Sequence, residues 1–124
     1  MRQRGDILEA SNRARDAGKH YIIFYEGFDE INFIGGMVTH MESERNIAMS
    51  ENHFEKNDKL GNGYKFQFEN TQLVIAKLMK FETWGPFTKV GALSEAGMQF
   101  VQNIIDDLPL ETWEEYLHRI SKLF

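Results

Sequence analysis

The stretch YIIFYEGFDEINFIGGMVT, residues 21–39, carries the strongest fold signal in the chain. Its two ends, residues 21–25 and residues 31–39, are rich in β-branched and aromatic side chains, which favour strands. The segment between them contains a glycine and has the length of a hairpin loop. The stretch therefore predicts a β-hairpin that turns near Phe28.

This hairpin predicts a site where its two strands meet. Folding the chain about Phe28 places His20 opposite residues 37–39, so the start of one strand meets the end of the next. Thr39 and His40 lie at that end. Imidazole exchanges protons near neutral pH, and a hydroxyl donates hydrogen bonds. His20, Thr39 and His40 are therefore candidate catalytic residues, although a histidine at a strand end is also a common surface residue.

Outside the hairpin, further strands are expected. Residues 5–10 and 46–50 have strand composition, and residues 64–68 alternate aromatic and polar side chains, which predicts a half-buried strand. Residues 71–81 form a long apolar run that fits a strand bent or broken in its middle. The spacing of this run also fits a helix, so both interpretations are kept. Gly35 and Gly36 inside the hairpin indicate a bulge, a bend or a close backbone approach.

The C-terminal part predicts two helices. Ser94 has the residue type of an N-cap, and Pro109 ends the first helix. Thr112 and Glu115 have the spacing of a capping box, which predicts a second helix within residues 110–124. The first helix has an apolar stripe at helical spacing, formed by Met98, Val101, Ile104, Ile105 and Leu108.

Strands first and helices last predict an α+β fold that is mainly β. Glycines within strands favour a small, strongly bent barrel, for which we expect five to seven strands and two C-terminal helices. The 124 residues suit a single domain over residues 1–124. An apolar content of 42% and a charged content of 27% are ordinary for a soluble globular protein.

The composition also limits the function. The formal net charge is −5 and the chain has no cysteine, which excludes disulfides and thiolate chemistry and makes a cytoplasmic location our expectation. No apolar stretch approaches the about 20 residues that cross a bilayer, so we expect no membrane partner. Acidity disfavours broad nucleic-acid binding, but Arg13, Arg15 and Lys19 belong to an early basic segment. That segment forms either a small anion site or an ordinary solvated surface.

Four segments together resemble one protein family. In order, they are RGDIL at residues 4–8, GKHYIIF at residues 18–24, FIGGMVTH at residues 33–40 and KVGALSEAGM at residues 89–98. Their order and spacing are similar to those of the MazF/PemK toxin family, which has an SH3-like barrel. The resemblance covers residues 4–108 and leaves the helix at residues 110–124 as an addition.

The resemblance implies a metal-independent endoribonuclease of a toxin–antitoxin system. It further implies a homodimer that a cognate antitoxin neutralises, with single-stranded RNA as the substrate and no cofactor. The catalytic arginine of the family falls on His20, and its catalytic threonine falls on Thr39. The chain departs from the family pattern because His20-Tyr21 replaces Arg-Pro, Met37 replaces a proline, and the loop before Gly18 is a few residues shorter.

The residues of this site suit RNA cleavage on chemical grounds. Attack by the 2′-hydroxyl of RNA needs a base, an acid for the leaving oxygen and donors for the phosphate. His20, His40 and Thr39 supply catalytic groups. Lys19 adds an ammonium, and the loop residues Arg13 and Arg15 are expected to bind flanking phosphates.

Two other interpretations stay open. The chain is alternatively a catalytically silent SH3-like module that binds a protein, or an immunity- or antitoxin-type interaction protein whose acidic C-terminal helices capture a basic partner. A metal site is not expected, because His53 and His118 are isolated and no His-x-x-x-His or His-Glu-x-x-His spacing occurs.

Overall fold

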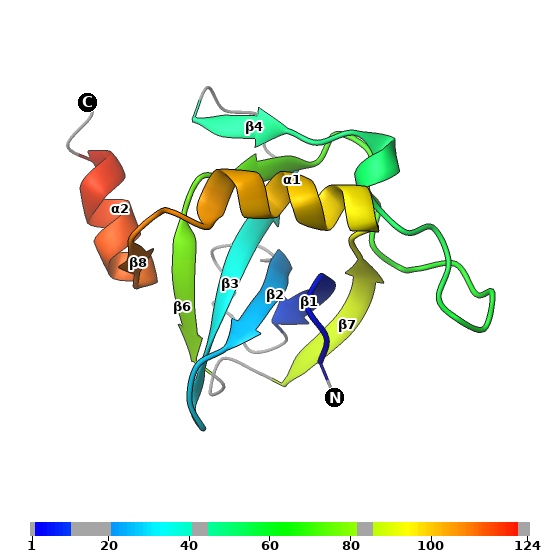
Figure 1. Cartoon of the computed structure of the whole chain (residues 1–124), viewed down its shortest axis with the longest axis horizontal. Coiled ribbons are helices and arrows are strands. Elements are labelled where there is room, and N and C mark those ends of the chain that lie inside the picture. Colours follow the sequence, from blue (N-terminus) through cyan, green and yellow to red (C-terminus); the bar gives the residue numbers. More distant parts are fainter. Residues whose placement is uncertain (1, 11–20, 41–44, 82–85, 122–124) are drawn as a thin grey trace.

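The structure is a computed structural model that describes residues 2–10, 21–40, 45–81 and 86–121. These residues form a mainly antiparallel sheet with two helices, so the fold is α+β and mainly β, as predicted (Figure 1). The elements, in chain order, are β1 (Asp6–Ala10), β2 (Tyr21–Gly27), β3 (Asn32–Thr39), β4 (Asn46–Ala48), the 3₁₀ helix η2 (Glu51–His53), β5 (Gln72–Val74), β6 (Lys77–Phe81), β7 (Phe87–Ala92), α1 (Glu95–Ile105), β8 (Leu110–Glu111) and α2 (Trp113–Ser121).

The strands are hydrogen-bonded in the order β4-β5-β3-β2-β1-β7. The long strand β3 pairs with β6 over its first half and with β5 at its end, and β8 joins β6 in parallel. The described residues thus contain eight strands rather than the expected five to seven. Two features account for the difference, because one apolar run supplies both β5 and β6, and β8 is a two-residue strand.

The predicted hairpin is confirmed. Tyr21 of β2 lies opposite Val38 of β3, and the same register continues until it shifts at a bulge just after Phe24. Opposite this point lies Gly35, where a Cβ atom would stand 2.8 Å from the carbonyl oxygen of Ile23. The two backbones therefore approach each other more closely than a larger residue allows, which confirms the predicted close approach.

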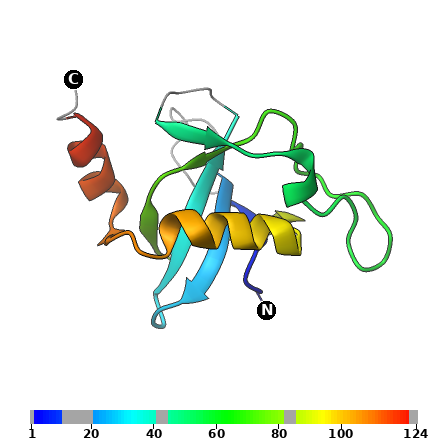
Figure 2. The ribbon, with the colours of Figure 1, turned by 45° about the horizontal axis from the view of Figure 1, so that its top comes forward.

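The sheet has two faces with different covers. We call the face under α1 the α1 face and the other the distal face. Figures 1 and 2 both show α1 running across the sheet and α2 lying at one end of it. Because side chains alternate along a strand, Ile23 points into the core under α1, whereas Ile22 points to the distal face. The core of the α1 face includes Ile7, Ile23, Tyr25, Val38, Leu73, Val101 and Ile105, all nearly inaccessible to solvent.

The distal face carries two separate apolar clusters. The α2 cluster joins Met37, Val74, Ala76 and Leu78 of the sheet to Tyr116 of α2. The Leu8 cluster is centred on three buried residues, and its members are Leu8, Ile22 and Phe33, with Phe24 and Phe87 packed against them. The distal face is therefore apolar at both ends. Unlike the α1 face, it is not crossed by one helix of the described residues.

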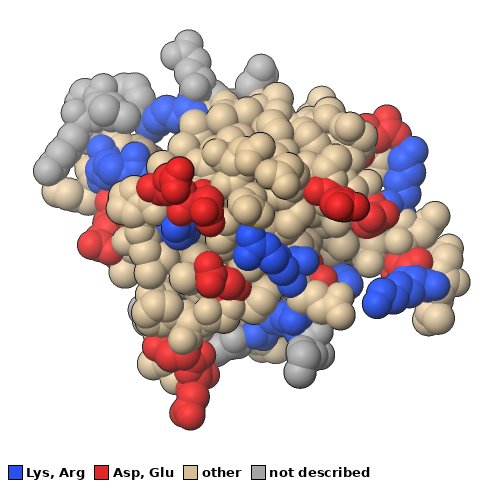
Figure 3. Space-filling model, viewed as in Figure 1, with Lys and Arg blue, Asp and Glu red and all other residues tan. Residues whose placement is uncertain are grey.

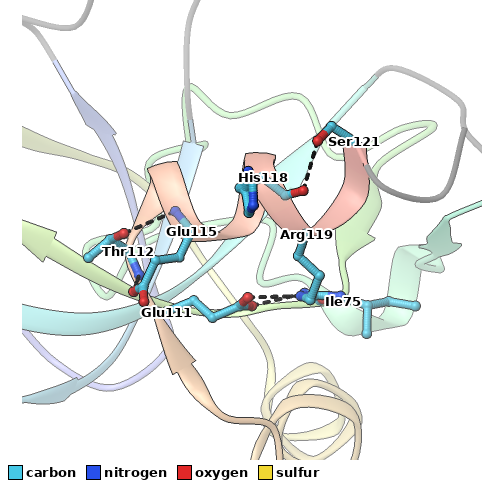
Figure 4. Close-up of polar contacts among 7 residues, drawn as sticks. All are labelled: Ile75, Glu111, Thr112, Glu115, His118, Arg119 and Ser121. Carbon is cyan, nitrogen blue, oxygen red and sulfur yellow. Dashed lines mark hydrogen bonds and ion pairs between the residues drawn. The ribbon is translucent and has the colours of Figure 1, made fainter.

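Both predicted helix caps are confirmed. The Ser94 hydroxyl accepts a hydrogen bond from the Gly97 amide at 3.1 Å, which satisfies one of the free donors at the start of α1. At the start of α2, the Glu115 amide donates to the Thr112 hydroxyl at 3.1 Å and the Thr112 amide donates to the Glu115 carboxylate at 2.8 Å (Figure 4). This reciprocal pair is the capping box that the spacing predicted.

Two local predictions need correction. Residues 64–68 form no strand, although Phe66 is buried between exposed neighbours and its amide donates to the Val90 carbonyl at 2.8 Å. Alternation alone does not make a strand when no neighbouring ladder continues the pairing. The second helix also begins later than expected, because Leu110 and Glu111 pair with β6 as β8 before the capping box starts α2.

The predicted break in the apolar run at residues 71–81 is confirmed. β5 ends at Val74 and β6 begins at Lys77, with the Ala76 amide bonded back to the Val74 carbonyl at 3.0 Å. This tight turn lets one segment pair with both ends of β3. The sheet is consequently bent along β3, although its path through the described residues stays open, with β4 and β7 as its ends.

Candidate functional site

Thr39 is the last residue of β3 and is half-buried. It lies opposite Gln72 of β5, and its position two residues after Met37 places its side chain on the distal face. Residues that lie directly opposite each other in an antiparallel pair share a face, so the Gln72 side chain lies on the distal face too. The Oε1 atom of Gln72 is buried and has no hydrogen-bond partner among the described residues. Thr39 thus stands beside a polar side chain at the edge of the α2 cluster.

His40 turns the opposite way. Its ring stacks on Phe66 with 5.4 Å between ring centres and meets the edge of Tyr21 at 5.9 Å. Phe66 belongs to the core of the α1 face, so His40 and Thr39 point to opposite faces although they are neighbours in the chain. The Nε2 atom of His40 lies 2.5 Å from the Gln67 carbonyl oxygen. A carbonyl only accepts, so Nε2 is the donor in this contact.

The other predicted site residues, His20, Lys19, Arg13 and Arg15, lie outside the described residues. The pairing register on which the prediction for His20 depends is described up to the pair Tyr21–Val38.

The structure also shows a charged hollow on the distal face that the sequence argument did not single out. It measures about 560 Å³ and is lined by Arg2, Asp6, Leu8, Phe87 and Lys89. The Lys89 ammonium lies 3.1 Å from the carboxylate of Asp6, which is buried and also accepts a hydrogen bond from the Gln3 amide at 2.8 Å. An ion pair with a buried carboxylate fixes the position of Lys89 on β7.

The surroundings of Lys89 favour its charged form. Burial acts to lower the pKa of Lys89, but the hydrogen bond and the charge of Asp6, with a smaller effect of Tyr64, outweigh burial and raise it. The ammonium also lies 5.6 Å from the centre of the Tyr64 ring. Beside it, the Arg2 guanidinium lies 5.1 Å from the ring centre of Phe87 and 5.5 Å from that of Phe33. Cations and aromatic rings are thus interleaved along this edge of the sheet.

A second hollow adjoins the first and shares Lys89 with it. It measures about 300 Å³ and is lined by Asp58, Gly63, Tyr64, Lys65, Lys89 and Val90. The Asp58 carboxylate accepts hydrogen bonds from the Leu60 and Asn62 amides, both at 2.9 Å, so it is engaged in holding its own loop. The only sequence signal for this ion pair is the lysine in the motif KVGAL. Its partner Asp6 is 83 positions away, and the sheet brings the two residues together.

Arg119, in the last turn of α2, belongs to a different kind of charged group. Arg119 donates to both carboxylate oxygens of Glu111, at 2.8 and 2.9 Å, and reaches the Ile75 carbonyl at 3.4 Å (Figure 4). This clamp ties α2 to β8 and to the turn between β5 and β6. Its groups are paired with one another, which suits a structural role.

Charges of both signs are interspersed over the surface seen in Figure 3, in the view that places α1 in front. At the lower end of that view, however, the charged side chains are acidic. Among the residues that the structure describes, no three histidine, aspartate or glutamate side chains are placed to hold a metal ion. None of the described helices is both long and apolar enough to cross a membrane.

Comparison with known proteins adds no relative. No family model matches the chain, and no curated protein or solved structure is significantly similar to it.

Proposed function

We propose that this chain is a metal-independent endoribonuclease of toxin type that cleaves single-stranded RNA through attack by the 2′-hydroxyl on the adjacent phosphate. The observation that carries the proposal is the β2–β3 register, in which Tyr21 lies opposite Val38. His20 precedes Tyr21 in the chain and Thr39 follows Val38. The resemblance to the MazF/PemK family assigns its two catalytic positions to these same two residues.

The proposal includes an SH3-like barrel. Three observations support a strongly curved sheet: the bulge after Phe24, the close approach at Gly35, and the pairing of β3 with two strands along one edge. Bulges and glycines are the devices by which strands bend toward closure. In the proposal, the end of β3 lies on the concave side of this curved sheet, where the RNA binds.

Each group has a defined task in the proposed reaction. His20 accepts the proton of the 2′-hydroxyl, the 2′-oxygen forms a bond to phosphorus, and the bond from phosphorus to the 5′-oxygen breaks. Lys19 gives its proton to that leaving oxygen, and the Thr39 hydroxyl donates to a phosphate oxygen. Arg13 and Arg15 bind the neighbouring phosphates. Because His40 is bonded to Gln67 on the α1 face, we assign it to positioning the strand end rather than to proton transfer.

The test is cleavage of single-stranded RNA by the purified protein in EDTA, with the product ends identified by mass spectrometry. We expect 2′,3′-cyclic phosphate or 3′-phosphate ends. The variant His20→Ala should be slower by about 100-fold or more, because it loses one proton-transfer role. The matched control is His118→Ala, which removes an exposed histidine on α2. Loss of activity in EDTA, or equal rates for His20→Ala and the control, contradicts the proposal.

The proposal extends to partners. A toxin of this type is a homodimer that a cognate antitoxin silences, so the purified protein should have the mass of two chains in light scattering. Its induced expression should arrest growth, and co-expression of the antitoxin should restore it. If the protein arrests growth but has the mass of one chain, the homodimer is wrong and the toxin activity still stands.

A second candidate function, a silent protein-binding module, is favoured by the tip of the hairpin. Phe28 and Ile31 are 56% and 59% exposed there, between acidic side chains. Large exposed apolar residues close together are typical of contact sites for other proteins. If the purified protein cleaves no RNA and expression leaves growth unchanged, the protein-binding function replaces the nuclease.

A further inference from the structure

The two hollows at β7 form one continuous strip, which we call the β7 strip. It consists of Arg2, Phe87, Lys89, Tyr64 and Lys65, in spatial order along the edge of the sheet. Lys89 lines both hollows, so they meet at this residue. Three of the five residues are cations and two are aromatic, on a chain whose net charge is −5. Asp6 and Asp58 also line the hollows, so cations outnumber carboxylates there by one, whereas carboxylates outnumber cations in the protein as a whole.

The β7 residues of the strip, Phe87 and Lys89, share the distal face with Thr39. Lys89 lies opposite Leu8, and Leu8 lies opposite Ile22. Ile22 in turn lies opposite Met37, which is two residues before Thr39 on the same face of β3. From β3 to β7 the sheet takes three steps. At about 4.8 Å for each step along the sheet, the backbone of Lys89 lies about 14 Å from that of Met37.

We propose that the β7 strip binds single-stranded RNA next to the nucleotides that reach Thr39. This inference rests on the proposed function. The cations bind the phosphates of the strand, and the Tyr64 ring stacks on one of its bases, which is the combination found in proteins that hold single strands without reading their sequence.

Two acidic side chains, Asp6 and Asp58, line the hollows beside the strip, and both are engaged within the protein. Asp6 is buried, is paired with Lys89 and accepts the Gln3 amide, so its charge is already balanced. Asp58 accepts two backbone amides of its own loop. Lys65, by contrast, is exposed at the mouth of the second hollow, and the Lys89 side chain is 43% exposed despite its ion pair. Phosphates approaching the strip therefore meet ammonium groups first.

The test uses an RNA probe that cannot be cleaved, so that binding is measured apart from chemistry. A short fluorescein-labelled 2′-O-methyl RNA of mixed sequence lacks the attacking hydroxyl, and its fluorescence anisotropy gives the Kd. Tyr64→Leu should raise the Kd about tenfold, by loss of one stacked base, whereas Tyr64→Phe keeps the ring and should bind as the wild type does. Lys65→Gln should weaken binding and lower the slope of log Kd against log salt concentration by about 0.7, the effect of one phosphate contact.

The matched control is Lys77→Gln, which makes the same change of charge on β6, where Lys77 bonds to the Asp106 carbonyl at the end of α1. It should leave the salt slope unchanged. Variants of Lys89 are avoided because they would leave Asp6 buried without its partner.

Cleavage of unmodified RNA is measured in parallel with the same preparations, which separates the two proposals. If Tyr64→Leu and Lys65→Gln bind the probe as Lys77→Gln does, the β7 strip is not an RNA site, even if the wild type cleaves RNA. If binding depends on Tyr64 and Lys65 but no RNA is cleaved, the strip is confirmed and the proposed nuclease is wrong.

Discussion

The α1 face and the distal face are formed by the same strands but carry different kinds of side chain. Under α1 the side chains form one continuous apolar core, and α1 lies so close that a Cβ atom at Gly36 would contact Ile105. The distal face has two smaller apolar clusters. Thr39 lies toward one side of this face, and the Asp6–Lys89 pair lies toward the other. The α1 face therefore holds the fold together, whereas the distal face has room for polar and charged side chains. The two faces should therefore respond differently to substitution.

The largest effect is expected where α1 meets η2. A Cβ atom at Gly97 would lie 1.9 Å from the His53 carbonyl oxygen, so Gly97→Ala must push the helix away from the 3₁₀ turn. We expect a loss of about 3 kcal/mol in the free energy of unfolding, at the upper end of overpacking effects. The matched control is Gly27→Ala, because nothing lies within 4 Å of a Cβ atom there. Urea denaturation measures both, and equal stabilities for the two variants would show that the α1 face tolerates a shift.

A smaller effect is expected at the other end of α1. The Tyr25 hydroxyl donates to the Asp106 carboxylate at 2.5 Å, and burial, with this bond, raises the pKa of Tyr25 to about 12. Tyr25→Phe should lose about 2 kcal/mol of stability at neutral pH, the range for a hydrogen bond to a charged group. The raised pKa means that the folded state disfavours the phenolate. The stabilisation is therefore complete below pH 10.0, the ordinary value, and is lost as the pH rises toward 12.

Denaturation at a series of alkaline pH values tests this. The wild type should lose stability between these two values, and Tyr25→Phe should lose less. Asp106→Asn keeps an acceptor oxygen but removes the charge, so its loss at neutral pH should be smaller than that of Tyr25→Phe. A wild type whose stability is flat across this range, or a fully stable Tyr25→Phe, would be the contrary result.

The acid side of the pH profile involves His53. Its ring packs on Phe100 with 4.3 Å between ring centres, its Nδ1 atom accepts the Ser50 amide at 3.0 Å, and burial lowers its pKa below the ordinary 6.5. The unfolded chain therefore binds a proton more readily, so this contribution is present above pH 6.5 and is lost as the pH falls through the folded pKa. Glutamine does not titrate, so the free energy of unfolding of His53→Gln should change less with pH in this range. His118→Gln, which changes an exposed residue of α2, should behave as the wild type does. Identical profiles for the wild type and His53→Gln would rule out this role.

The smallest effect is expected from the clamp at α2, on the distal side. The Arg119 side chain is 47% exposed, so its paired bonds to Glu111 are screened by water even though the geometry is good. Arg119→Met should cost about 1 kcal/mol or less in urea denaturation and should leave RNA binding unchanged. A loss as large as that of Gly97→Ala would mean that α2, and not α1, is the element on which the fold depends.

Local signals in the sequence predicted most of the fold. The β-branched run at residues 21–25, the N-cap Ser94 and the capping box from Thr112 act between neighbouring residues, so the sequence alone indicates them. The strand pair formed by β6 and β8 could not be predicted, because two residues carry no periodicity. Residues 64–68 have the right alternation but lack a partner ladder, which is a property of the tertiary structure.

The site was predicted less well than the fold. Thr39 and His40 are adjacent, and the period of a strand already places adjacent side chains on opposite faces, so the separation of these two was available from the sequence. The Asp6–Lys89 pair was not, because it joins the first strand to β7 and depends on their register. Gln72, beside Thr39, likewise enters only through the pairing of β3 with β5.

The most direct test of the proposed reaction is the rate of RNA cleavage by Thr39→Val under single-turnover conditions, beside Thr88→Val as the control. Valine has the shape of threonine without the hydroxyl, and Thr88 is exposed on β7. Loss of a donor to the phosphate should slow Thr39→Val by about 100-fold, while Thr88→Val cleaves at the wild-type rate and both variants keep the stability of the wild type. A Thr39→Val variant that cleaves RNA as fast as Thr88→Val would contradict a catalytic site at the end of β3.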